Sequence, residues 1–343
     1  MRVLICTDSI GALASADAGA ALGRAFRAAA PATQVAVVPM ASGGDALGAA
    51  LGVLGDDAVV VRAPGDAHRD IHGDIHRDAD RDAPAWEHLV HASSAGLGEA
   101  LLRALADAPA RVVVDLTALV THDGGAGLLH ALGARADVAL DAGAAGLAGL
   151  TDVDLTPARA ALGAADLIAV VPAAELGDLL LGLRGLAARR GHAAGIDPAV
   201  MLATDAALGA LASALGQADA PGLGAAGGCV LALAALGAEV TSGPALCAQV
   251  AGLERTAGLA DVLVTGADTL DFATRGGDVV AEVAATAGRV LRPCVAVARR
   301  VDVSARELRT FGLEVAYELG GEPDLDADGL TARAGGVASS WTW

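Results

Sequence analysis

The stretch VVVDLTALVTHDGGAGLLHALG, residues 112–133, contains the pattern from which the fold can be derived. Its first five residues, 112–116, are apolar except for Asp115 and begin with three valines, which is typical of a buried strand. Polar and glycine residues follow, and the apolar stretch at 125–132 predicts a helix. A strand, a turn and a helix in this order are the repeating part of a βαβ fold, so the pattern is expected to recur along the chain.

The pattern does recur. Seven further apolar runs predict strands at residues 3–6, 35–38, 58–61, 167–171, 262–265, 295–298 and 313–316. Helices are expected at 15–30, 94–106, 198–215, 225–236 and 277–287. Because these strands are continuously apolar rather than alternating, both faces of their sheets should be covered, as in parallel sheets. The predicted class is α/β with mostly parallel sheets, and ligand sites should lie at the carboxyl ends of the strands.

Composition excludes several classes of protein. The 343 residues suffice for two domains, and the 23 basic residues are all arginine, so no lysine is available for a phosphate loop or a Schiff base. The net charge of −18 disfavours nucleic acid and anionic membranes as partners. Only seven residues are aromatic, which predicts no stacking platform for bases. A cytoplasmic protein is expected, and its assembly into a homo-oligomer is left open.

A histidine- and aspartate-rich run, HRDIHGDIHRDADRD, occupies residues 68–82. His68, His72 and His76 would share one helical face and could bind a divalent metal. The run lacks cysteine and a closing set of carboxylates, so we interpret it as a solvated surface segment inside a variable insert at 66–92. Any metal in this run is therefore not expected to be structural.

Two glycine-rich segments follow predicted strands or helices. In THDGGAGLLHALG, from residue 121, Gly124 and Gly125 could bind an anion, and Asp123 could cap the helix, orient a substrate hydroxyl or accept its proton. In PGLGAAGG, from residue 221, the glycine spacing matches a dinucleotide-binding motif, but no buried strand precedes it, which argues against an NAD site. Gly227 and Gly228 then serve either anion binding or close helix packing.

Acidic residues also follow strands. The segment VTGADTLDFATRGG, residues 264–277, contains Asp268 and Asp271, which either bind Mg²⁺ or are solvated loop residues. Polar or glycine positions also follow the first two predicted strands: Asp8, Ser9, Gly43 and Gly44.

In this order, the segments resemble the bacterial glycerate kinases over nearly the whole chain. The matching segments are MRVLICTDS (1–9), VPMASGGD (38–45), SSAGLGEALL (93–102), THDGGAGLLHALG (121–133), LLGLRG (180–185), PGLGAAGG (221–228) and VTGADTLD (264–271). The resemblance implies two α/β domains, one interrupted by the other, with the active site in the cleft. The implied reaction transfers the γ-phosphate of ATP to glycerate with Mg²⁺. The expected domains are 1–65 with 265–343, and 93–264.

The resemblance also implies roles for individual residues. Catalytic roles fall on Asp8, Ser9, Asp123 and Asp271, and Mg²⁺ binding falls on Asp268 and Asp271. Substrate or phosphate binding falls on Gly43, Gly44, Gly124, Gly125, Arg184, Gly227, Gly228 and Arg275. In this assignment Arg184 and Arg275 are the candidates to replace lysine.

The chain departs from the family at its charged positions. Where the family has a lysine after the first Asp-Ser, this chain has Ile10, Gly11 and Ala12, and two further family lysines correspond to Ala194 and Asp278. His122 replaces an asparagine, and a Gly-Glu-Gly-Arg motif reads GADT at 266–269. Phosphoryl transfer depends on charge stabilisation, so these changes predict weak or absent kinase activity. The alternatives are an active kinase and an inactive paralogue that binds a small acid or regulates a partner.

Overall fold

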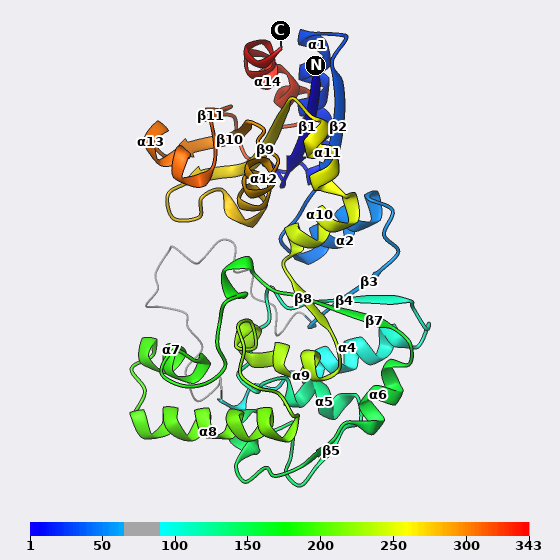
Figure 1. Cartoon of the computed structure of the whole chain (residues 1–343), viewed down its shortest axis with the longest axis vertical. Helices are drawn as coiled ribbons and strands as arrows, with labels where there is room; N and C mark the ends of the chain where they lie inside the picture. The colour runs from blue at the N-terminus through cyan, green and yellow to red at the C-terminus, as the bar shows by residue number, and fades with distance from the viewer. Residues whose placement is uncertain (65–89, 343) are drawn as a thin grey trace. The chain divides into compact units, whose positions relative to one another are not determined.

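The computed structural model describes residues 1–64 and 90–342, which form two compact units (Figure 1). Unit 1 comprises Met1–Asp57 and Gly243–Trp343, and unit 2 comprises Ala58–Ser242. The chain returns to unit 1 at residue 243 rather than at the expected 265. The reason is that α10 (Gly243–Ala251) and α11 (Leu253–Leu259) contact two helices of that unit, α2 (Gly44–Val53) and α12 (Gly277–Arg289). The predicted insert at 66–92, with His68, His72 and His76, lies almost entirely outside the described residues.

Unit 1 is built on a five-stranded sheet in the order β11-β10-β9-β1-β2, and all of its strand pairs are parallel. The strands are β1 (Arg2–Thr7), β2 (Gln34–Pro39), β9 (Val262–Asp271), β10 (Cys294–Asp302) and β11 (Val315–Glu318). In the register, Ile5 of β1 lies opposite Val37 on one side and Val264 on the other. These aliphatic rows follow from the continuous apolar runs in the sequence, and the predicted parallel sheet is confirmed.

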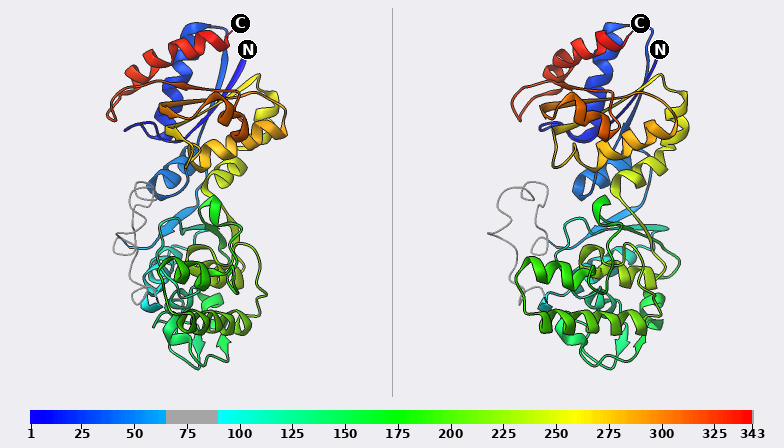
Figure 2. Two further views of the ribbon diagram at one scale, coloured as in Figure 1. Left: turned by 90° about the vertical axis from the view of Figure 1, so that its left-hand side faces the viewer. Right: turned by 60° about the vertical axis from the view of Figure 1, so that its left-hand side comes forward.

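Helices cover both faces of this sheet. On one face, α1 (Ser15–Ala29) and α14 (Ala327–Trp341) lie side by side and pack on Val3, Ile5, Val262 and Val264 (Figure 2). On the other face, α11 and α12 contact β1 and β9. The remaining helical elements of unit 1 are α13 (Ala305–Leu308) and the 3₁₀ turn η5 (Arg309–Phe311).

Unit 2 has a four-stranded parallel sheet in the order β3-β4-β7-β8. Its strands are β3 (Val59–Arg62), β4 (Arg111–Asp115), β7 (Asp166–Val170) and β8 (Glu239–Thr241), beside a small antiparallel pair, β5 (Arg135–Ala136) and β6 (Val153–Asp154). Its helices and 3₁₀ turns are α4 (Ala95–Leu105), α5 (Ala126–Ala131), η2 (Ala144–Leu147), α6 (Thr156–Leu162), η3 (Ala173–Glu175), α7 (Leu186–Ala193), α8 (Pro198–Ala214), η4 (Ala225–Gly228) and α9 (Cys229–Ala235). The three-residue β8 was not predicted.

The helix expected at 225–236 begins later than predicted. Ala226, Gly227 and Gly228 have φ angles of 50°, 68° and 79°, so the backbone turns in the left-handed sense before α9 starts at Cys229. Local apolar composition does not reveal this turn. Within 1–64 and 90–342, no helix combines the length and hydropathy that a membrane span requires.

Candidate functional site

The sheet of unit 1 contains a topological switch point. From β1 the chain moves to β2 on one side, and it later places β9 on the other side of β1. In open parallel sheets the helix connections on the two sides diverge at such a point, which leaves room for a ligand at the carboxyl ends of the strands. The pairing of β1 with β9 ends at Thr7 and Gly266. The candidate site of unit 1 is therefore the edge formed by the residues that follow these two positions.

Asp8 and Ser9 lie at this edge, as predicted from the sequence. The Asp8 amide donates to the carbonyl oxygen of Gly266 at 3.0 Å, which ties the end of β1 to β9. The Asp8 carboxylate accepts a hydrogen bond from the Ser9 amide at 2.7 Å. Asp8 is half-buried and Ser9 is exposed, so both side chains are accessible to a ligand at the edge.

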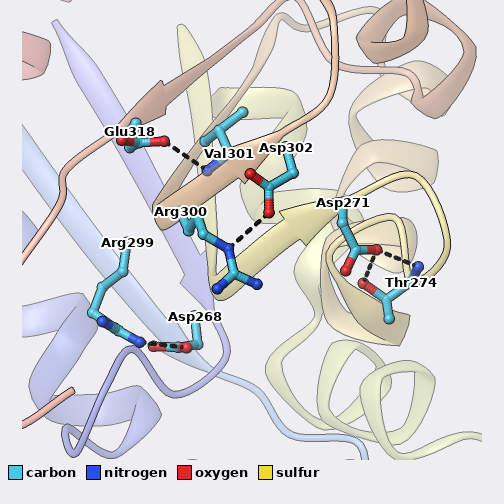
Figure 3. Close-up of polar contacts among 8 residues, drawn as sticks. All are labelled: Asp268, Asp271, Thr274, Arg299, Arg300, Val301, Asp302 and Glu318. Atoms are coloured by element: carbon cyan, nitrogen blue, oxygen red, sulfur yellow. Dashed lines mark hydrogen bonds and ion pairs between the residues drawn. The ribbon is translucent and has the colours of Figure 1, made fainter. Parts of the chain in front are cut away.

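Asp268 is already paired. Its carboxylate accepts two hydrogen bonds from the Arg299 guanidinium, from Nε at 2.5 Å and from Nη2 at 2.9 Å, and a third from the Gly11 amide at 2.9 Å (Figure 3). The hydrogen bonds from Arg299 hold the pKa of Asp268 below its usual value. Arg299 also donates through Nη1 to the carbonyl oxygen of Gly321 at 2.9 Å. Asp268 therefore joins the loop after β1 to β9, and Arg299 joins the loop after β11 to β10.

Asp271 lies on the other face of β9. Side chains of a strand alternate between the faces, and three positions separate Asp271 from Asp268. The Asp271 carboxylate instead accepts hydrogen bonds from the amide and hydroxyl of Thr274, at 2.7 and 2.9 Å (Figure 3). The two aspartates therefore do not share one ion, and Mg²⁺ binding by either of them alone stays a prediction. In the described part of the chain, no group of three or more histidine, cysteine, aspartate or glutamate side chains is placed to bind a metal.

The glycine turn after β2 reaches the same edge of unit 1. The amide of Met40 donates to the carbonyl oxygen of Thr7 at 3.3 Å, and Gly43 and Gly44 then lead into the ten-residue helix α2. Gly44 has a φ of 68°, whereas Gly43 is extended. Asp45 places a negative charge in the first turn of α2, where it competes with any bound anion for the helix dipole. Phosphate binding by this turn stays a prediction.

Arg184 and Arg275 lie in different units. Arg184 is exposed in the loop before α7 of unit 2. Arg275 follows β9 of unit 1, has a φ of 54°, and places its guanidinium 5.5 Å from the ring centre of Phe311. Their substitution for lysine in one site remains a prediction.

Asp123, the acidic residue predicted for unit 2, has no exposed surface. Its carboxylate accepts four hydrogen bonds: from the amide and hydroxyl of Ser94 at 2.7 and 2.8 Å, and from the amides of Gly125 and Gly127 at 3.0 and 3.1 Å. Burial raises the pKa of Asp123, and these hydrogen bonds oppose that effect. The carboxylate joins the beginnings of α4 and α5, so the structure shows the capping role. The catalytic role remains a prediction.

The two glycine turns of unit 2 pack against each other. The Gly124 amide donates to the carbonyl oxygen of Gly227 at 3.3 Å, and the Gly125 amide is bound by Asp123. A Cβ atom on Gly228 would lie 3.1 Å from the Gly124 Cα, and all four glycines are buried. Because the amides of Gly124 and Gly125 already donate within the protein, they do not form the free anion cradle that the sequence suggested. Close packing, the alternative for Gly227 and Gly228, is what the structure shows.

A buried polar cluster adjoins these turns. His122 has no exposed surface, and its pKa is lowered to about 3, first by burial and then by the nearby charge of Arg190. Arg190 extends from α7 and donates to the carbonyl oxygen of Thr121 at 2.5 Å. Glu175 accepts a hydrogen bond from the amide of Ala226 at 2.8 Å. These contacts join α7 to the segment before Asp123 and the left-handed turn to η3.

The lowered pKa of His122 predicts a pH-dependent stability. Histidine has a pKa near 6.5 in an unfolded chain, so unfolding takes up a proton at every pH between about 3 and 6.5. The stabilisation is complete above pH 6.5 and is lost as the pH falls, by about 1.4 kcal/mol per pH unit. Urea denaturation at several pH values should therefore show a shallower slope for His122→Asn than for the parent, by up to about 1.4 kcal/mol per pH unit.

The exposed His192 provides the matched control, because His192→Asn removes an imidazole from the surface rather than from the core and should not reproduce the effect of His122→Asn. Equal slopes for the parent and His122→Asn would show that the imidazole is not kept neutral by its burial.

The profile of the glycerate kinase family matches residues 3–334. The chain belongs to the glycerate kinase family. Among its relatives are the Glycerate 2-kinase of Escherichia coli K12, 28% identical over 348 residues that cover 93% of this chain and 90% of that protein, and an uncharacterised Mycobacterium tuberculosis protein, 29% identical over 343 residues that cover 93% and 84%.

A solved structure has the same fold. The crystal structure assigned to glycerate kinase 2 of Salmonella typhimurium LT2 superimposes with a TM-score of 0.75 at 22% sequence identity, covering 99% of this chain and 98% of that one. The predicted family and fold class are therefore confirmed for this glycerate kinase family member.

Of the three residues that stand where the resemblance implies a lysine, Gly11 does not accommodate a side chain. Gly11 has a φ of 59°, and a Cβ atom would lie 2.6 Å from the carbonyl oxygen of Pro323. The neighbouring Ala12 is exposed, as is Ala194 at the end of α7, and Asp278 lies in the first turn of α12. Restoration of positive charge is sterically compatible with Ala12 but not with Gly11.

Sequence reasoning missed Arg299 and Arg190. Two arginines, Arg299 and Arg300, directly follow the strand predicted at 295–298, and this was an available signal for positive charge at a strand end. It does not show that Arg299 pairs with Asp268, because the two residues lie 31 positions apart. Arg190 follows Arg189 in the sequence, and nothing in the sequence indicates which of the two side chains points inward.

Proposed function

We propose that this glycerate kinase family protein binds a small organic acid and transfers phosphate from ATP only weakly or not at all. The observation that carries the proposal is the pairing of Arg299 with Asp268 at the switch point of unit 1. The adjacent Arg300 is also paired, with Asp302 at 2.7 Å. Both arginines at this strand end thus have aspartate partners, and the chain contains no lysine.

The electrostatic requirement of phosphoryl transfer supports the proposal. Negative charge spreads over the oxygens of the transferred group, and enzymes stabilise it with cations, metal ions and free backbone amides. In this chain Arg299 and Arg300 of β10 are each ion-paired with an aspartate, and the amides of Gly124 and Gly125 donate to protein acceptors. The family implies ATP and Mg²⁺, but Asp268 and Asp271 do not fit a shared Mg²⁺ ion, so we derive no metal-dependent step.

An active kinase is the second candidate. The relation to a protein named Glycerate 2-kinase, over 93% of this chain, favours it. In that reaction a glycerate hydroxyl oxygen would bond to the γ-phosphorus, the bond to the ADP oxygen would break, and a base would take the hydroxyl proton. Asp8, accessible at the switch point, is the residue we would assign to that proton.

The test is release of ADP from Mg-ATP in the presence of glycerate, with calorimetric titration of glycerate alongside it. We expect a turnover well below ~1 s⁻¹, the lower end of the usual kinase range, together with measurable glycerate binding. The triple variant Ala12→Lys, Ala194→Lys and Asp278→Lys should release ADP faster because it restores cations at accessible positions.

The charge-matched control carries Ala29→Lys, Ala203→Lys and Asp328→Lys, at exposed positions outside the matching motifs. It should behave as the parent does. A parent turnover of ~1 s⁻¹ or more would show that the active-kinase alternative is correct.

A further inference from the structure

Within the described part of the chain, three hydrogen-bond donors converge on the carboxylate of Asp268. The Arg299 guanidinium donates from Nε to Oδ1 at 2.5 Å and from Nη2 to Oδ2 at 2.9 Å (Figure 3). The Gly11 amide donates to Oδ1 at 2.9 Å. A guanidinium that binds both oxygens of a carboxylate, with a backbone amide beside it, is an arrangement by which proteins recognise free acids. Here the anion that satisfies these donors is a side chain of the protein itself.

The donors are positioned by contacts that do not involve Asp268. Arg299 lies directly across from Asp268 in the register of β10 with β9, so the sheet fixes where its side chain begins. Its Nη1 donates to the carbonyl oxygen of Gly321 at 2.9 Å, and only 16% of its side chain is exposed. The Gly11 backbone packs against the same arginine, since a Cβ atom on Gly11 would lie 3.6 Å from Arg299 Cδ. Loss of the carboxylate should therefore leave the donors in place.

The position of the carboxylate is open to solvent. The Asp268 side chain is 44% exposed, although the arginine that it binds is mostly covered. A small anion could therefore reach the donors without any unfolding of the sheet edge, if the Asp268 carboxylate were removed. A competing acid is close by, because the charge of the exposed Glu322 also acts on Arg299. Any test of the donors has to take Glu322 into account.

We propose that Asp268 is a built-in ligand, whose carboxylate occupies an oxyanion site formed by Arg299 and Gly11 and keeps small carboxylates from solution out of it. Each oxygen of Asp268 binds a different guanidinium nitrogen, a pattern that a free carboxylate reproduces and that chloride does not. The carboxylate belongs to the same chain, so a free acid competes with a ligand of high local concentration. This role of Asp268 requires neither ATP nor glycerate and is independent of the proposed function.

The test opens the site with Asp268→Ala and uses formate as the probe, because formate can take the place of the missing carboxylate. In chloride buffer this variant should unfold at a lower urea concentration than the parent, since its donors have lost their acceptor. Added formate should raise the midpoint progressively, whereas the same concentration of chloride should not. Titration of the Gly11 amide resonance in ¹H–¹⁵N NMR spectra should give a formate Kd at least about tenfold lower than in the parent.

Asp302→Ala is the matched control. Asp302 receives a hydrogen bond from Arg300 Nε at 2.7 Å in the neighbouring ion pair, but both side chains are more than half exposed. Exposed ion pairs of this kind contribute little to stability, so formate should not change the urea midpoint of Asp302→Ala. The double variant Asp268→Ala/Glu322→Gln removes the competing acid. Formate binding by either the single or the double variant supports the proposal.

Three outcomes would overturn the proposal: no formate binding by both of these variants, equal formate affinity in the parent and Asp268→Ala, or an equal response of Asp302→Ala. A variant that folds in formate but not in chloride would be the extreme form of the expected result. If Asp268→Ala folds in neither salt, Asp268→Asn, which keeps the side-chain shape and removes the charge, replaces it in the same titration. The titrations contain no ATP or glycerate, so their failure is distinguishable from failure of the proposed function.

Discussion

Alanine at position 227 is expected to destabilise unit 2 by about 4 kcal/mol or more, a loss that single substitutions rarely reach. Gly227 has a φ of 68°, and a Cβ atom there would lie 1.9 Å from the carbonyl oxygen of Thr121. Because that oxygen belongs to the backbone, it cannot move away as a flexible side chain could. The measurement is urea denaturation of the parent and Gly227→Ala.

Gly216 gives a control with the same backbone angle. Its φ is 67°, and nothing lies within 4 Å of the position where a Cβ would be. Gly216→Ala should therefore cost only the left-handed conformation, roughly 1–2 kcal/mol. If the two variants lost equal stability, the contact between the glycine turns would have no energetic weight, and the close-packing interpretation of Gly227 would fail.

The second large effect is expected for Asp123→Ala. The substitution leaves four donors from Ser94, Gly125 and Gly127 without their acceptor in a site that water does not reach. Each buried donor that loses its partner costs roughly 1–3 kcal/mol, although partial relaxation makes the total smaller than the sum. A loss of about 3–5 kcal/mol in the free energy of unfolding is expected by urea denaturation.

Asp197 is the matched control for a capping aspartate. It is exposed at the beginning of α8 and accepts one hydrogen bond, from the Ala199 amide at 2.7 Å. Asp197→Ala should cost about 1 kcal/mol. A different result for Asp123→Ala itself would change the role assigned to Asp123. If Asp123→Ala kept the parent's stability and lost glycerate binding, the catalytic or substrate-orienting role suggested by the sequence would be correct.

The fold was predictable because its determinants are local. Continuous apolar runs in β1, β4 and β9 identify buried strands, and helices between them require parallel pairing through crossover connections. The short β8, with three residues and a partly exposed pattern, has too little local signal to be predicted. The unit boundary at 243 was missed for a related reason, since it depends on which helices α10 and α11 contact.

The sequence predicted at which strand ends the residues of the candidate site lie, but it did not predict which side chains contact one another there. Asp8 and Ser9 lie where the end of a buried strand predicted them. Asp268 and Asp271 look like one acidic pair in the sequence, but the two-residue period of the strand places them on opposite faces. The three-residue spacing was enough to predict that the two side chains lie on opposite faces. The sequence does not identify the partner of Asp268, because Arg299 is brought to it by the register of β9 with β10.

The sequence by itself determined the α/β class, the strand ends that carry polar residues, the family and the lack of any lysine. The class, the strand ends and the missing lysine depend on residue type or on spacing within a few positions, and the family depends on the order of short segments along the chain. Only the tertiary structure decided that Arg299 neutralises Asp268 and that the glycine turns at 124–125 and 227–228 pack together. These contacts join residues that are distant in the chain, and they form because strand register and helix packing bring their backbones together.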